Sequence, residues 1–61
     1  MDETLATALQ LFFATITPQV PDPAMERAIE KVSDVIARVA QGEITANKAA
    51  SYIRDVVTVL S

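Results

Sequence analysis

All three prolines of this 61-residue chain fall within six residues, from Pro18 to Pro23. Each proline fixes its own φ angle, lacks an N–H donor and biases the residue before it towards an extended backbone. Neither a helix interior nor a central strand accommodates such a segment. The chain is therefore predicted to be divided here by a stiff connector, with separate regular elements on either side.

The segment before the connector has the spacing of an amphipathic helix. Its apolar residues recur three or four positions apart, which places them on one face of a helix. This face consists of Leu5, Ala8, Leu9, Phe12, Phe13 and Ile16. Asp2 can cap the start of the helix and Pro18 ends it, so the sequence predicts a helix over about residues 3–17.

The same segment could be read as a transmembrane helix, because residues 4–21 carry no charged side chain. Its helical part spans only ~20 Å, less than the ~30 Å hydrocarbon core of a bilayer. Phe12 and Phe13 could insert into a membrane surface instead, but the helix lacks the Lys or Arg that meets anionic lipid. We expect no membrane partner, and we favour packing of both phenylalanines in the core with Tyr52, the third aromatic residue.

The residues after the connector show the clearest helical pattern of the chain. Asp22 can accept hydrogen bonds from the first turn, and Pro23 at the first helical position loses none, which predicts a helix over about residues 23–41. Its predicted central stripe is Met25, Ile29, Val32, Ile36 and Val39, flanked by Ala28, Val35 and Ala40. The same spacing matches a coiled-coil seam, but the segment is too short to separate a coiled coil from a globular core.

A third helix is predicted over about residues 46–60. Gly42 suits the left-handed turn that ends the second helix, and Thr45 is placed to cap the third. The apolar stripe consists of Ala46, Ala49, Ala50, Ile53, Val56, Val57 and Leu60. Residues 56–60 have β propensity, but no partner strand is predicted. The fold class is thus all-α: one domain, residues 1–61, in a three-helix up-down array.

Composition makes association the default expectation. Apolar burial contributes about 85 kcal/mol, against about 90 kcal/mol for ordering the chain. Small domains usually improve this balance with disulfides, a metal or association, and the chain has neither Cys nor His. We expect a homo-oligomer, completed by packing of helices between copies, or a complex with a partner protein. The candidate interface residues lie beside the stripes or at their edges: Leu11, Phe13, Tyr52 and Val59.

The sequence offers little for catalysis. It lacks His and Cys, and a single Gly cannot build a glycine-rich phosphate loop. Glu26, Glu30 and Asp34 recur every four residues, as carboxylate metal ligands do, but they alternate with basic residues and lack the Glu-x-x-His pair of dimetal bundles. A solvated charged face explains them. We expect no enzyme activity, no cofactor and no metal.

Residues 35–54 look like a helix-turn-helix, which supplies an alternative function. Asn47, Lys48, Ser51 and Arg54 would then face the major groove of DNA. A glycine turn with a threonine cap also describes any short helical hairpin. Five basic residues, spread along the sequence, against eight acidic ones leave little for phosphate contacts.

The main interpretation is therefore a structural or protein-binding module that self-associates, with a DNA-binding regulator as the alternative. The start of the chain, Met1-Asp2-Glu3, is acidic where a secretory signal carries basic residues. We accordingly expect a cytoplasmic location, which includes the possibility of a virion component.

Overall fold

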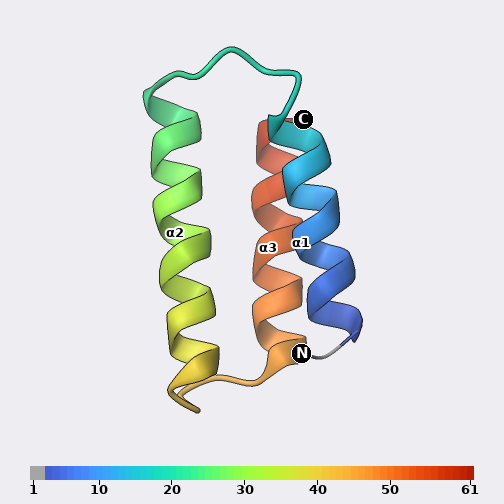
Figure 1. Cartoon of the computed structure of the whole chain (residues 1–61), viewed down its shortest axis with the longest axis vertical. Helices are drawn as coiled ribbons and strands as arrows, with labels where there is room; N and C mark the ends of the chain where they lie inside the picture. Colours follow the sequence, from blue (N-terminus) through green and yellow to red (C-terminus); the bar gives the residue numbers. More distant parts are fainter. Residues whose placement is uncertain (1–2) are drawn as a thin grey trace.

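Three helices make up the computed structural model, which describes residues 3–61. They are α1 (Glu3–Ile16), α2 (Pro23–Ala40) and α3 (Ala46–Leu60). Figure 1 shows that α2 runs antiparallel to both α1 and α3, so the chain goes up, down and up again. The predicted all-α array is confirmed, and α1 and α2 each end one residue earlier than expected. Asp2, the predicted cap of α1, lies outside the described residues.

Side-chain caps start α2 and α3 where the sequence predicts them. Asp22 Oδ1 accepts a hydrogen bond from the Met25 N–H at 2.8 Å. Thr45 Oγ1 accepts one from the Lys48 N–H at 3.1 Å. Both helix starts therefore follow from local chemistry.

The proline-rich connector is attached to the end of α3, because the Gln19 side-chain amide donates a hydrogen bond to the Leu60 carbonyl at 3.3 Å.

Gly42 provides the backbone conformation that turns the chain from α2 towards α3. Its φ is 77°, in the left-handed region that glycine adopts without strain. A Cβ at this position would have no atom within 4 Å beyond its chain neighbours, so only the backbone opposes a larger residue. We expect Gly42→Ala to lower the free energy of unfolding by about 1 kcal/mol in urea titrations. A loss several times larger would contradict this assignment, because it would require a packing role for Gly42.

The core lies where α3 meets the other two helices. α1 packs against α3, and α2 packs against α3. The core residues are Leu5, Ala8 and Phe12 of α1, Ala28, Val32 and Val35 of α2, and Ala49, Ala50, Ile53 and Val57 of α3. Among the described residues, no polar or charged side chain is buried. Ala49 and Ala50 of α3 are fully buried, and their small side chains let the neighbouring helices approach closely.

The buried face of α2 differs from the predicted stripe. Ile29, predicted at its centre, is 40% exposed, whereas Ala28 and Val35, predicted at its flank, are buried. The reason is that α2 packs mainly on α3. The side of α2 that carries Ala28 and Val35 borders α3, while the side that carries Ile29 and Ile36 borders α1.

The aromatic residues divide between core and surface. Phe12 is fully buried, but Phe13 and Tyr52 are exposed. The expectation that all three aromatic residues pack together in the core is therefore wrong for two of them. Neighbouring residues on a helix point about 100° apart, so only one of two adjacent phenylalanines can face the centre of the core.

Candidate functional site

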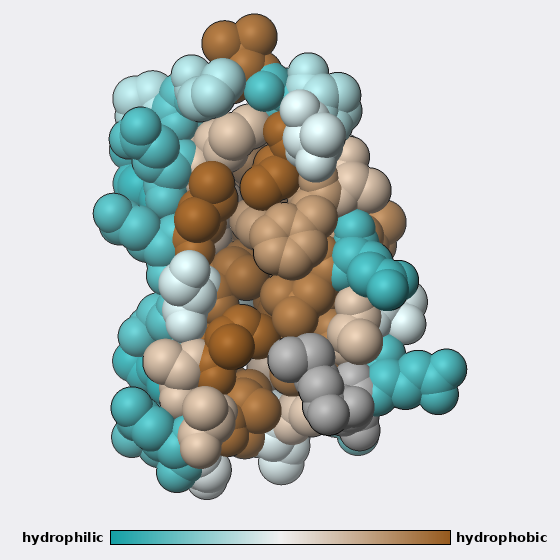
Figure 2. Space-filling model, viewed as in Figure 1, coloured by the Kyte–Doolittle hydropathy of each residue, from teal (hydrophilic) through white to brown (hydrophobic). Residues whose placement is uncertain are grey.

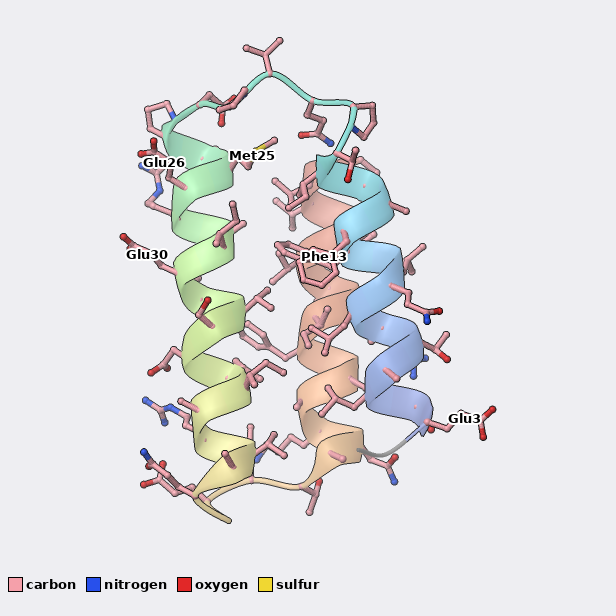
Figure 3. The ribbon with its side chains drawn as sticks, in the orientation of Figure 1. Glu3, Phe13, Met25, Glu26 and Glu30 are labelled. Atoms are coloured by element: carbon pink, nitrogen blue, oxygen red, sulfur yellow. The ribbon has the colours of Figure 1, made fainter. Side chains whose placement is uncertain are left out.

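An apolar groove, here called the α1–α2 groove, separates α1 from α2 and has a volume of about 350 Å³. It is lined by Leu9, Phe12, Phe13, Ile29, Val32, Ser33 and Ile36. Figure 2 shows the apolar band that runs down this face of the molecule. In Figure 3 the ring of Phe13 lies between α1 and α2, in front of α3. The groove exists because both helices pack on α3 rather than closely on each other.

The charges next to the α1–α2 groove are acidic. Glu26 precedes Ile29 by three residues and Glu30 precedes Ser33 by three, so each is a surface neighbour of a groove residue on α2. Both carboxylates lie on the outer side of α2 (Figure 3). The sequence contains no Lys or Arg before Arg27, so α1 adds no positive charge. This face is consequently apolar with an acidic edge.

A second surface, here called the α2–α3 groove, consists of two adjoining cavities of about 380 and 360 Å³ that share Lys31 and Tyr52. Its apolar part is Ala24, Ala28, Val35, Ile44, Tyr52, Val56, Val59 and Leu60. Its charged part is Arg27, Lys31, Arg38 and Lys48, with Asp34 and Asp55.

The α2–α3 groove gathers charges that are spread in the sequence. Four of the five basic residues line it, although the chain as a whole carries a net charge of −3. One acidic residue, Asp34, is paired with Arg38 at 3.0 Å. The pair is exposed and therefore adds little stability, and the six charged residues of the groove together have a net charge of +2. This face is apolar with a basic edge.

The four candidate interface residues are all exposed, but they lie on three different surfaces. Phe13 is 56% exposed and lines the α1–α2 groove. Tyr52 at 40% and Val59 at 83% line the α2–α3 groove. Leu11 at 47% lines a hollow of about 420 Å³ between α1 and α3. Sequence reasoning missed Ile29, because the regular spacing of α2 placed it in the core.

The candidate DNA contacts are also exposed, and the helices around them run antiparallel. Asn47, Lys48, Ser51 and Arg54 all lie on the surface of α3. Lys48 borders the α2–α3 groove, whereas Arg54 borders the hollow beside α1. The two helices of a helix-turn-helix cross at about 90–120°. Here α2 and α3 run antiparallel as neighbours (Figure 1), which differs from that arrangement.

Other kinds of site find no support in residues 3–61. No three acidic side chains in this range come close enough together to hold a metal ion. In the same range, no helix has both the length and the apolar character to cross a membrane.

Comparisons of the chain with protein-family models, with curated proteins and with solved structures found no match. What the chain does must therefore be inferred from its own surfaces.

Proposed function

We propose that this chain is a non-enzymatic structural module that associates with copies of itself through apolar helix faces. The observation that carries the proposal is the α1–α2 groove, where Phe13 and Ile29 are exposed next to the core. In a closed three-helix bundle, the neighbouring helix would cover these side chains. Contiguous exposed apolar surface is typical of interfaces.

A second copy is the occupant that suits these surfaces. The lining of the α1–α2 groove contains no charge, so the centre of the surface that covers it should be apolar, with any charges at the edge where they keep their hydration or find a partner. The chain itself has exposed apolar side chains to offer, including Tyr52 and Val59. We propose a cytoplasmic setting, as one small component of a larger assembly such as a virion.

Replacing Phe13 with aspartate should weaken self-association without unfolding the chain. Phe13 is more than half exposed, so its loss costs the monomer little, whereas a carboxylate in the interface would have to be desolvated. Light scattering over a concentration series should show the wild type as a multiple of 6.6 kDa. We expect Phe13→Asp to weaken association by at least about tenfold, or about 1.4 kcal/mol.

The matched control is Gln10→Asp. Gln10 is exposed on the same helix and lines neither groove, so this variant should associate like the wild type. Circular dichroism should show unchanged helicity in both variants. A wild type that stays monomeric at every concentration would overturn the proposal. A Phe13→Asp variant that associates fully would remove the α1–α2 groove from the interface.

A further inference from the structure

We infer that the copies associate head to tail, with the α1–α2 groove of one copy against the α2–α3 groove of the next. The assembly is then a ring or a filament and not a symmetric dimer. This inference rests on the proposed self-association and specifies the two surfaces that meet.

Charge favours contact between unlike grooves. The α1–α2 groove has Glu26 and Glu30 beside it and no basic residue in its lining. The lining of the α2–α3 groove has four basic and two acidic residues, a net charge of +2, and Asp34 is paired with Arg38. Contact between two identical grooves would bring like charges together, which is unfavourable. Contact between the two different grooves brings opposite charges together at the edges of an apolar centre.

Coverage of the apolar side chains points to the same arrangement. Phe13 and Ile29 are exposed in one groove, and Tyr52 and Val59 are exposed in the other. A symmetric contact through either groove covers one pair and leaves the other pair in water. A head-to-tail contact covers both pairs in every copy that has two neighbours.

The positions of the grooves on α2 determine how the assembly grows. Relative to the buried Val32, Ile29 and Ile36 lie about 40–60° to one side, while Lys31 and Arg27 lie about 100–140° to the other, at about 100° per residue. The two grooves therefore flank the buried face of α2 on opposite sides. A contact between different surfaces that point in opposite directions does not close with two copies, and it continues into a ring or an open filament.

The test uses one variant for each surface. Phe13→Asp blocks the α1–α2 groove, and Val59→Asp blocks the α2–α3 groove. Each variant alone has no intact pair of unlike grooves, so each should be monomeric by light scattering. An equimolar mixture should form a one-to-one pair with twice the mass of 6.6 kDa and nothing larger, because one intact groove of each kind remains.

The controls are two variants with the same new charge outside both grooves. Gln10→Asp and Thr58→Asp place the same charge at exposed positions outside both grooves and should assemble like the wild type. If Val59→Asp or Phe13→Asp alone still forms dimers, the contact is symmetric and the head-to-tail inference fails, while self-association stands. If the wild type is monomeric, the proposed function fails first.

Charge-reversed variants provide a second test that keeps the apolar side chains. Glu26→Lys with Glu30→Lys makes both grooves basic at their edges, and Arg27→Glu with Lys31→Glu shifts the α2–α3 groove towards negative charge. All four residues are exposed, so the fold should persist. Each double variant should assemble at least about tenfold more weakly than the wild type, and mixing them should restore large assemblies. A mixture that stays as small as its components would overturn the inference.

Discussion

Phe12→Ala is expected to unfold much of the chain at 25 °C. Phe12 is 1% exposed and is the largest of the fully buried side chains. Removing a buried phenylalanine side chain costs about 3–5 kcal/mol. A single core in a chain of this size rarely supplies more than about 3–5 kcal/mol in total. Circular dichroism during urea or thermal denaturation should show a much weaker helical signal or an unfolding midpoint far below that of the wild type.

The neighbouring substitution Phe13→Ala is the control for this prediction. The Phe13 side chain is largely exposed, so its removal should change the free energy of unfolding of the monomer by less than about 1 kcal/mol. The comparison should be made at a protein concentration low enough to keep the wild type monomeric, so that lost association does not contribute. Equal destabilisation by the two substitutions would contradict the burial of Phe12 in this fold.

Ala50→Leu should be strongly destabilising for the opposite reason, because it adds volume where none is available. Ala50 is fully buried in α3, the helix on which both others pack. Overpacking of a core typically costs about 1–3 kcal/mol. In a domain of this size, each kcal/mol lowers Tm by about 4–8 °C. We therefore expect a drop in Tm of roughly 10–20 °C in a thermal melt followed by circular dichroism.

Ser51→Leu distinguishes the packing effect from any effect of leucine on the helix itself. Ser51 follows Ala50 in α3 but is exposed, so the same new side chain meets solvent there. This variant should melt within a few degrees of the wild type. A similar loss of Tm in both variants would show that α3 does not hold its alanines against the other helices.

The surfaces show where prediction from sequence succeeds and where it stops. Tyr52 and Val59 lie seven residues apart beside the stripe of α3, and the structure places both in one groove. Leu11 and Phe13 are also exposed, but on different sides of α1. Their exposure could be expected from their distance to the centre of each stripe. Their grouping could not, because it depends on which helix lies next to each flank.

The grouping of the basic residues also depends on which helices lie side by side. Arg27, Lys31, Arg38 and Lys48 are spread over two helices in the sequence, yet they line one groove. Three of them share one side of α2, which a helical projection alone can reveal. Lys48 joins them only because α3 packs antiparallel beside α2 (Figure 1), and no pattern within a single helix contains that information.

The three helices and their connections could be predicted from the sequence, with the ends of α1 and α2 correct to within one residue. These features depend on local chemistry: three clustered prolines, the caps at Asp22 and Thr45, and a glycine with positive φ. The burial of Phe12 and not Phe13, and of Ala28 in place of Ile29, depends instead on how the helices pack. The apolar arc of each helix is wider than the area that its neighbouring helices cover. Packing against α3 therefore sets the rotation of each helix about its axis, and this rotation decides which residues remain available for a partner.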